Sequence, residues 1–466
     1  MKIEQLYTNC LAEAAYYIES KGEVAIIDPM REPEPYIQMA KERGAKIKYI
    51  FETHFHADFV SGHLDLAKLT GATIVYGPTA QMNFDAHVAQ DGEEFELGDL
   101  TIKTLHTPGH TMESTTWLLK DKNGNDHSIY SGDTLFIGDV GRPDLAVKSD
   151  LSKEDLAGHL YDSIYNKIMP LADDVIVYPG HGAGSACGKN LSKETWSTLG
   201  EQKKNNYALN TTGKEDFVNQ VLDGIMPPPQ YFPKNAVLNK TGYKSLDEII
   251  QTADRALSYT DFNSYAKDAL VLDTRSPKEF AQGHIPNALF IGLDGSFASW
   301  IGTLVEDLEQ PILLVVDEGR GEEAITRMAR VGYSGVLGYL EGGMNNYISN
   351  GGETIIENEV SASELAEAYK SSNIQVADVR KPSEFEAEHL ENAINQPLDF
   401  MLSEEVGLDP NQSYYVHCKG GYRSLVAISL LRQKGFSKLI NVQGGFDKML
   451  ETDMPMTAFQ CPSQNK

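Results

Sequence analysis

The chain has 466 residues, and its 40 Lys and Arg residues against 67 Asp and Glu residues give a formal net charge of −27. This charge repels phosphate backbones and anionic lipid, which argues against nucleic acid and membrane surfaces as partners. A chain of this length exceeds one ordinary hydrophobic core, so we expect roughly three domains.

The N-terminal segment and the cysteines indicate a reducing compartment. Acidic residues interrupt the first residues of the chain, where an export signal needs an apolar stretch. No apolar run approaches the roughly 20 residues that span a bilayer. Cys10, Cys187, Cys418 and Cys461 include no CxxC pair and are too few for a disulfide framework. We therefore expect a cytoplasmic protein with free thiols, and we assign no role to Cys10 or Cys461.

Short apolar strands alternate with polar or helical stretches in the N-terminal part of the chain. Several strands, such as those in IKYIFETH, LTIKTLHTPGH and DVIVYPGH, end in His or Asp. Loops at strand ends can gather such residues around one cleft, so we predict a layered α/β or β-sandwich domain with a site along one edge. The segment 225–239 contains too many prolines for a helix or a central strand. We expect it to be a wrapping tail or a domain boundary.

An ordered set of strand-end residues is the strongest signal in this domain. Its members are His54, His56, Asp58, His110, Asp133 and His181. Imidazole nitrogens and carboxylate oxygens together are ligands for a transition metal. Single residues such as His63 or His87 are better explained as hydrogen-bonding groups at strand ends. The whole set, in order along the chain, predicts a metal centre.

The set and its spacing resemble the metallo-β-lactamase superfamily, in particular its glyoxalase II and persulfide dioxygenase branches. The resemblance extends over about residues 1–240 and implies an αββα sandwich. The superfamily motif HxHxDH has its third His directly after Asp58, where this chain has Phe59. A second ion would then have only Asp58, His181 and a shared Asp133, which disfavours a hydrolase with two zinc ions.

The persulfide dioxygenases hold one mononuclear Fe(II) ion, and the resemblance implies its ligands here. These would be His54, His110 and Asp133. Two imidazoles and one carboxylate on one face are typical of non-haem Fe(II) oxygenases. The same resemblance makes His56 a near neighbour of the metal. Asp58 and His181 would orient the ligands or bind solvent.

Two further residues are accessory candidates beside the predicted metal centre. Arg142, in GDVGRPDL, is a candidate to bind an acidic thiol substrate or, equally, a salt-bridged residue of a surface loop. Cys187, in GHGAGSACGKNL, is either a structural cysteine or a thiol at the mouth of the site that accepts or relays sulfur.

Two copies of a roughly 100-residue unit follow this domain. The stretch ALVLDTRSPKEFAQGHIPNA at 269–288 matches IQVADVRKPSEFEAEHLENA at 374–393, and LEGGM at 340–344 matches VQGGF at 442–446. Strands alternate with helices in both copies, which predicts two small parallel-sheet α/β domains. We place the three domains at residues 1–240, 243–352 and 357–460.

Cys418 begins the loop CKGGYR between an apolar strand and a helical run. Backbone N–H groups of such a loop point at the sulfur, and Lys419 and Arg423 add positive charge, so the thiolate is favoured. The loop, with DVRKPSEF and NVQGGF, resembles a rhodanese, a sulfurtransferase whose cysteine carries a persulfide. The first copy has Asp317 for Cys418 and Glu322 for Arg423. A carboxylate cannot carry persulfide sulfur, so we predict that this rhodanese-like copy is inactive.

We expect an α/β multidomain protein. Over nearly its whole length the chain resembles fusions of a persulfide dioxygenase with tandem rhodanese domains. This implies Fe(II)-dependent oxidation of a low-molecular-weight thiol persulfide by O₂ to sulfite, coupled to sulfur transfer that gives thiosulfate, in sulfide detoxification. We also expect a homo-oligomer, either a dimer or a tetramer. One alternative is a zinc-dependent glyoxalase II-like thioester hydrolase fused to a sulfurtransferase. Another is a sulfur carrier with a vestigial metal site.

Overall fold

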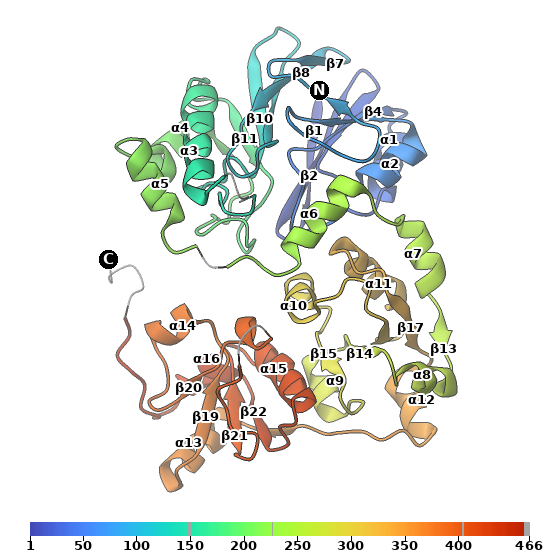
Figure 1. Cartoon of the computed structure of the whole chain (residues 1–466), viewed down its shortest axis with the longest axis vertical. Helices are drawn as coiled ribbons and strands as arrows, with labels where there is room; N and C mark the ends of the chain where they lie inside the picture. Colours follow the sequence, from blue (N-terminus) through green and yellow to red (C-terminus); the bar gives the residue numbers. More distant parts are fainter. Residues whose placement is uncertain (147–150, 226, 403–404, 461–466) are drawn as a thin grey trace. The chain divides into compact units, whose positions relative to one another are not determined.

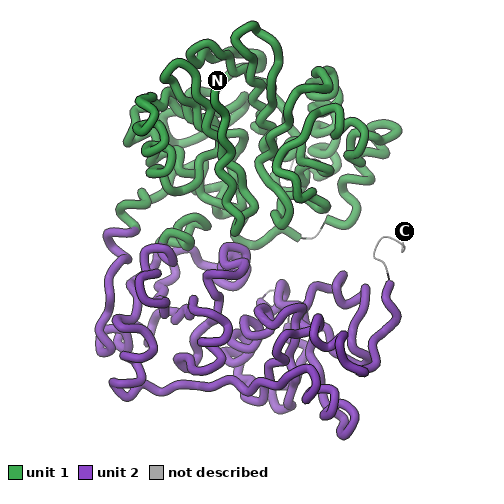
Figure 2. The backbone as a smooth tube through the Cα atoms, turned by 180° about the vertical axis from the view of Figure 1, so that it is seen from behind, with its two compact units in different colours: residues 1–249, 326–334 green, residues 250–325, 335–466 purple. Residues whose placement is uncertain are grey.

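The computed structural model describes residues 1–146, 151–225, 227–402 and 405–460, so Cys461 lies outside the described residues (Figure 1). The chain divides into two compact units (Figure 2). Unit 1 is Met1–Ile249 with Thr326–Ser334, and unit 2 is Ile250–Ile325 with Gly335–Lys466. Throughout the described ranges, every helix is too short or too polar to cross a membrane.

The described strands of unit 1 form two six-stranded sheets. The first runs in the order β1 (Lys2–Thr8), β2 (Glu13–Ser20), β3 (Glu23–Ile27), β4 (Lys46–Phe51), β5 (Thr73–Tyr76) and β6 (His87–Val88). The second runs in the order β12 (Ser197–Thr198), β11 (Ile176–Pro179), β10 (Asp126–Gly132), β9 (Thr115–Lys120), β8 (Leu100–His106) and β7 (Glu94–Leu97).

The two sheets pack face to face because alternate strand residues are apolar. Tyr16 and Phe51 of the first sheet share one core with Ile102 and Trp117 of the second, and the rings of Phe51 and Trp117 lie 4.6 Å apart. Burying an aromatic side chain of this size stabilises the fold by about 1.5–3 kcal/mol.

Helices cover the outer faces of both sheets. The outer face of the first sheet packs on α1 (Glu34–Glu42) and α2 (His63–Thr70), and that of the second packs on α3 (Lys153–Ser163) and α5 (Lys214–Leu222). The unit also contains α4 (Leu199–Asn205), α6 (Phe232–Thr241) and the first half of α7 (Leu246–Ala253). This arrangement is the predicted αββα sandwich.

The proline-rich tail differs from the prediction at its C-terminal end. We expected no helix within 225–239, but α6 begins at Phe232 and has Pro233 in its first turn. Proline is tolerated there because the first N–H groups of a helix have no intrahelical partner. The expectation was therefore wrong for 232–239, although the segment does pack on the domain before it: Asn239 of α6 hydrogen-bonds the carbonyl oxygens of His56 and Phe59.

Unit 2 contains two five-stranded sheets of the same strand order in its described residues. The first is β13 (Ala256–Leu257), β17 (Val336–Leu340), β16 (Ile312–Val315), β14 (Leu270–Asp273) and β15 (Leu289–Phe290). The second is β18 (Asn358–Val360), β22 (Leu439–Val442), β21 (Tyr414–His417), β19 (Gln375–Asp378) and β20 (Ile394–Asn395). The strand pairs are parallel in both sheets, as predicted.

Helices alternate with these strands in both copies. The first copy has α8 (Tyr259–Tyr265), α9 (Pro277–Gln282), α10 (Phe297–Leu304), α11 (Gly321–Arg330) and α12 (Gly343–Ser349). The second has α13 (Ala362–Ser371), α14 (Pro382–Ala387), α15 (Tyr422–Gln433) and α16 (Gly445–Met449). Both copies also contain the same buried ion pair, Asp273 with Arg275 and Asp378 with Arg380. The repeat in the sequence is thus a repeat of the fold.

Candidate metal centre and cysteine loop

The structure brings together His54, His110 and Asp133, which follow β4, β8 and β10. All three are buried, and one ligand atom of each lies within 4.8 Å of the others. Asp133 Oδ2 is 3.9 Å from His54 Nε2 and 3.4 Å from His110 Nε2. This oxygen has no hydrogen-bond partner among the described residues. The donor set and the unpartnered oxygen fit one transition-metal ion.

Oxygen atoms behind the two histidines determine which ring nitrogen faces the site. His110 Nδ1 donates to the carbonyl oxygen of Arg142 at 2.9 Å. His54 Nδ1 lies 3.0 Å from the hydroxyl of Thr53, which itself donates to Asp28 at 2.8 Å. A histidine that donates from Nδ1 keeps the lone pair of Nε2 for a metal. Both rings therefore present a ligating nitrogen to the site.

The charges around these residues favour the ligating protonation states. Burial lowers the pKa of His54 well below its ordinary value, and the neighbouring histidines act in the same direction. Burial alone would raise the pKa of Asp133. The charge and hydrogen bond of His181, with the charges of His110 and His54, outweigh burial and hold that pKa well below its ordinary value. A neutral imidazole and an ionised carboxylate are the forms that bind a metal.

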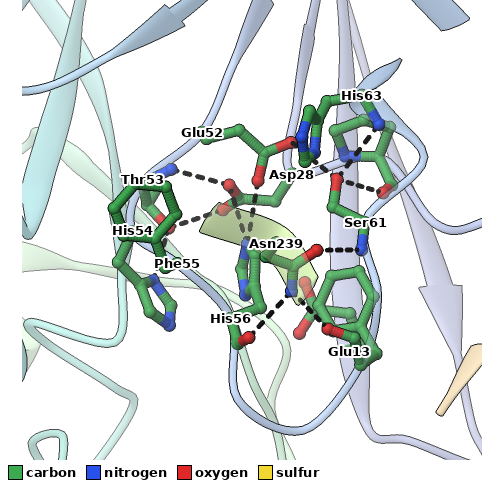
Figure 3. Close-up of polar contacts among 12 residues, drawn as sticks. Glu13, Asp28, Glu52, Thr53, His54, Phe55, His56, Ser61, His63 and Asn239 are labelled. Carbon is green, nitrogen blue, oxygen red and sulfur yellow. Dashed lines mark hydrogen bonds and ion pairs between the residues drawn. The ribbon is translucent and has the colours of Figure 1, made fainter. Parts of the chain in front are cut away.

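His56 lies next to this group and contacts a different set of buried acids (Figure 3). Its Nε2 is 3.1 Å from Asp28 Oδ1 and 3.4 Å from Glu52 Oε2, and its ring centroid is 4.2 Å from that of His54. Burial disfavours the charged imidazole, but Asp28 and Glu52 outweigh it and raise the pKa of His56 well above its ordinary value. Asp28 and Glu52 were not among the predicted site residues, although both directly follow strands.

Asp58, His181 and Cys187 form another buried group whose ligand atoms lie within 4.8 Å of one another. His181 Nε2 is 2.7 Å from Asp58 Oδ2 and 2.7 Å from Glu13 Oε2, and its Nδ1 is 2.7 Å from Asp133 Oδ1. Burial raises the pKa of Glu13 to about 7. Glu13 was missed because it starts a strand outside any motif.

Phe59 occupies the position where the superfamily motif has its third histidine. Its ring is fully buried and lies 4.4 Å from the ring of His56. Asn239 donates to the carbonyl oxygens of Phe59 and His56 at 2.7 and 2.8 Å and accepts the Ser61 N–H at 2.9 Å. The tail helix α6 therefore holds the loop that carries the metal motif.

The two accessory candidates both lie inside the protein. Arg142 donates to Asp144 at 2.7 and 2.8 Å and to the carbonyl oxygen of Ala186 at 3.2 Å. Its N–H donates to the carbonyl oxygen of Cys187 at 3.1 Å. Burial, followed by the charges of Asp133 and Asp58, raises the pKa of the Cys187 thiol well above its ordinary value. Arg142 thus connects two loops, and roles for either residue in substrate binding or sulfur relay stay predictions.

Cys418 lies directly after β21, in the loop that leads into α15. Its sulfur accepts the Gly421 N–H at 3.1 Å, and the side chain is 1% exposed. Lys419 is exposed, whereas Arg423 donates to both carboxylate oxygens of Glu384, at 2.6 and 2.9 Å. The loop thus supplies a backbone donor to the sulfur, and its arginine already has an acidic partner.

Asp317 takes the place of Cys418 in the first copy and lies after β16. Burial, followed by the charge of Glu279, raises its pKa. Arg320, in the same loop, pairs with Glu323 and Asp294. The described residues of this loop therefore offer neither a thiol nor a surplus of positive charge to an anionic sulfur donor.

Known families match both halves of the chain. Residues 8–181 match the Metallo-beta-lactamase superfamily, and residues 259–350 and 361–452 each match the Rhodanese-like domain. Human mitochondrial persulfide dioxygenase ETHE1 is 32% identical over 211 residues, which are 45% of this chain and 74% of that protein. The chain belongs to the metallo-beta-lactamase superfamily. Its superfamily domain precedes two rhodanese-like domains, which confirms the predicted fusion.

The relatives of this chain also include a hydrolase. Cytoplasmic hydroxyacylglutathione hydrolase of Arabidopsis thaliana is 31% identical over 186 residues, which are 39% of this chain and 67% of that protein. The crystal structure of a metallo-beta-lactamase from Staphylococcus aureus has a TM-score of 0.64 and 32% identity, and the match covers 73% of this chain and 98% of that one. The residues at the metal centre must therefore distinguish oxygenase from hydrolase.

The contact between α6 and the motif loop yields a prediction about metal affinity. Asn239→Ala removes two hydrogen bonds that fix the His56–Phe59 segment, so we expect metal affinity to fall about 10-fold or more, as for other residues that support metal ligands. Metal titration of the purified chain measures this. Asn210→Ala is the control, because Asn210 also donates its side-chain amide to a backbone carbonyl, that of Asn206 at 2.8 Å. Equal affinity in both variants would contradict the role given to Asn239.

Proposed function

We propose that this enzyme oxidises a low-molecular-weight thiol persulfide with O₂ and then couples the product to sulfur transfer. One persulfide, one O₂ and one water give the free thiol, sulfite and two protons. A second substrate persulfide transfers its outer sulfur to the Cys418 thiolate and leaves as the free thiol. The sulfite sulfur then attacks the outer sulfur of this Cys418 persulfide. The S–S bond breaks, its electron pair stays on Cys418 as a thiolate, and thiosulfate leaves. The substrate of the first step and the nature of the metal belong to this proposal.

The observation that carries the proposal is a group of three candidate ligands, in a chain where Phe59 replaces the last histidine of the metal motif. His54, His110 and Asp133 converge on one point, while the position of a further histidine ligand is occupied by a buried benzyl ring. Fe(II) in such a group supplies the electrons and the open coordination positions that O₂ and a sulfur ligand need, whereas Zn²⁺ cannot reduce O₂.

The residues around His54, His110 and Asp133 orient the Asp133 carboxylate and fill the space beside the neighbouring histidines. Phe59 lies 4.4 Å from the ring of His56, Phe136 lies 6.1 Å from the ring of His181, and both phenylalanines are fully buried. His181 holds Asp133 Oδ1 at 2.7 Å, which leaves Oδ2 directed at His54 and His110. The carboxylate is therefore oriented before any ligand arrives.

The cysteine loop supports the second half of the proposal. The Gly421 N–H at 3.1 Å from Cys418 stabilises the thiolate that forms when thiosulfate leaves. Lys419, exposed at the same loop, is available to attract an anionic sulfur donor. One chain that carries both sites raises the concentration of each intermediate near the other site.

Two alternatives receive less support. A zinc thioester hydrolase of the glyoxalase II kind is favoured by the hydroxyacylglutathione hydrolase relatives and by the Asp58–His181–Cys187 group. Phe59 opposes it, because the second ion would lack a histidine ligand. A sulfur carrier with a vestigial metal site is opposed by the intact ligand group. The domain boundaries 1–240, 243–352 and 357–460, the cytoplasmic location and the homo-oligomer stay predictions.

His110→Ala tests the ligand group. We expect it to abolish iron binding and O₂ uptake, because two remaining ligands hold Fe(II) poorly, and to leave sulfur transfer from thiosulfate unchanged. Metal analysis after anaerobic purification and an oxygen electrode measure the two effects. His87→Ala, at an exposed residue paired with Glu93, is the control. Full iron occupancy in His110→Ala would remove this residue from the ligand set.

Phe59→His tests the choice between oxygenase and hydrolase. We expect zinc binding to rise from about one to about two ions per chain, because the new imidazole joins Asp58 and His181. Phe55→His is the control: it adds an imidazole in the same loop, but Phe55 packs against Tyr76 at 4.7 Å. A stoichiometry that stays at one would show that Phe59 does not exclude the second ion. Two tightly held zinc ions and thioesterase activity in the unmodified chain would refute the oxygenase.

Cys418→Ser separates the two reactions. We expect the product to change from thiosulfate to sulfite while O₂ uptake persists, because serine cannot carry the sulfane sulfur. Ion chromatography of the products, with parallel O₂ measurement, checks this. Loss of O₂ uptake in a folded Cys418→Ser protein would contradict the division of labour.

A further inference from the structure

We call the second rhodanese-like copy, which carries Cys418, the active copy, and the first, which has Asp317 in its place, the silent copy. The cysteine loop of the active copy contacts the silent copy through Tyr422. Its hydroxyl donates to the carbonyl oxygen of Gly292 at 3.0 Å, and its ring centroid lies 5.8 Å from that of Phe290. Tyr422 is the first residue of α15 and directly follows Gly421, whose N–H donates to Cys418. A residue of the active loop therefore has its hydroxyl partner in the copy that lacks a cysteine.

Two glycines of the silent copy pack closely against the Tyr422 ring. We call residues 291–296 the Gly292 loop. A Cβ added at Gly295 would lie 2.4 Å from Tyr422 Cζ, and one at Gly292 would lie 3.4 Å from Tyr422 Cε2. Glycine at these positions makes room for the tyrosine. Burial raises the pKa of Tyr422 above its ordinary value, so its hydroxyl stays protonated and able to donate.

The Gly292 loop is hydrogen-bonded to the sheet of the silent copy. It also contacts the silent counterpart loop, which we define as residues 317–320, the equivalent of the cysteine loop. The N–H groups of Ile291 and Leu293 donate to Asp273 and Thr274 at 2.9 Å each. Arg320, which lies in the silent counterpart loop, donates to both oxygens of Asp294 at 2.8 and 3.1 Å. The Gly292 loop therefore connects the silent counterpart loop to the active cysteine loop.

A second contact fixes the same helix further along. Ser429 Oγ accepts the Phe290 N–H at 3.0 Å. Tyr422 and Ser429 are seven positions apart in α15 and so lie on one face of the helix. Contacts with the silent copy thus fix both the first turn and the middle of α15. In contrast, the adjoining loop residues Gly420 and Gly421 have no side chains to fix them.

We propose that Tyr422 is a positioning residue through which the silent copy holds the cysteine loop in its active form. The proposal rests on the sulfur-transfer function proposed for Cys418. Gly421 has a φ of 101°, a conformation that suits glycine and is one of many that a free glycine adopts. The hydrogen bond from the Tyr422 hydroxyl to Gly292 fixes Tyr422, which directly follows Gly421. It thereby keeps the Gly421 N–H directed at the Cys418 sulfur. The silent copy thus supports the cysteine loop of the active copy through the contact with Tyr422.

Tyr422→Phe tests the hydroxyl bond in the full-length protein. The primary measurement is the rate of Cys418 alkylation by iodoacetamide at neutral pH, followed by mass spectrometry of the Cys418 peptide. We expect this rate to fall about 3- to 10-fold, because loss of the bond to Gly292 lets the Gly421 N–H turn away from the sulfur and so weakens its hydrogen bond to the thiolate. In sulfur transfer from thiosulfate to cyanide, kcat should fall by a similar factor while KM changes little. O₂ uptake should not change.

Tyr369→Phe is the matched control. Tyr369 also donates its hydroxyl to a backbone carbonyl, that of Glu391 at 2.7 Å, but it is only partly buried and its partner lies in its own copy. We expect its alkylation rate and kcat to equal those of the unmodified protein. An equal fall in both variants would show a general effect of losing a tyrosine hydroxyl and would overturn the proposal.

Gly295→Ala tests the same contact from the silent copy, without a change in the active one. Its methyl group displaces the Tyr422 ring, so we expect slower alkylation of Cys418 and a lower kcat. Gly283→Ala is the control, because no atom lies within 4 Å of a Cβ there. Alkylation at the unmodified rate in folded Tyr422→Phe and Gly295→Ala proteins would refute the positioning role. An unmodified protein that transfers no sulfur would instead refute the proposed function, while the alkylation rates still test the contact.

Discussion

The carboxylate of Asp133 is the group on which the candidate metal centre depends. One oxygen accepts a hydrogen bond from His181, and the other faces His54 and His110 without a hydrogen-bond partner among the described residues. A buried carboxylate needs such compensation, because burial alone favours its neutral form. The imidazoles keep Asp133 ionised and oriented, and the backbone oxygen behind His110 directs that ring toward it. The sandwich fold makes this possible, since three strand ends meet at one edge.

His181 links this centre to a neighbouring group of acids. It lies at 2.7 Å from carboxylate oxygens of Glu13, Asp58 and Asp133, and their charges raise its pKa well above the ordinary value. The protein thus partly balances these buried acids by itself. Phe59 adds no ligand and fills the space beside His56.

The two rhodanese-like copies share one fold, but only the second has a cysteine in the loop before the helix. Both have the same strand order and the same buried Asp–Arg pair. They differ in the loop before the helix, where a thiol and a backbone donor in one copy correspond to Asp317 and Arg320 in the other. The Arg320 guanidinium binds Asp294, within the segment that also contacts Tyr422. A copy without a nucleophile therefore still contributes to the surroundings of Cys418.

The sequence by itself determined the families, the layered sandwich and the candidate ligands, because strand-end motifs and the internal repeat are local patterns that one linear reading reveals. It could not reveal Glu13, Asp28 or Glu52, whose importance comes from the histidines that the folded chain places against them. It also misjudged 232–239, where Pro233 falls in a helical first turn and Asn239 reaches the metal loop. Only the tertiary structure decided that Arg423 pairs with Glu384 and that Tyr422 contacts Gly292, 130 residues away. Such pairs depend on how distant segments pack, and neither composition nor spacing records that packing.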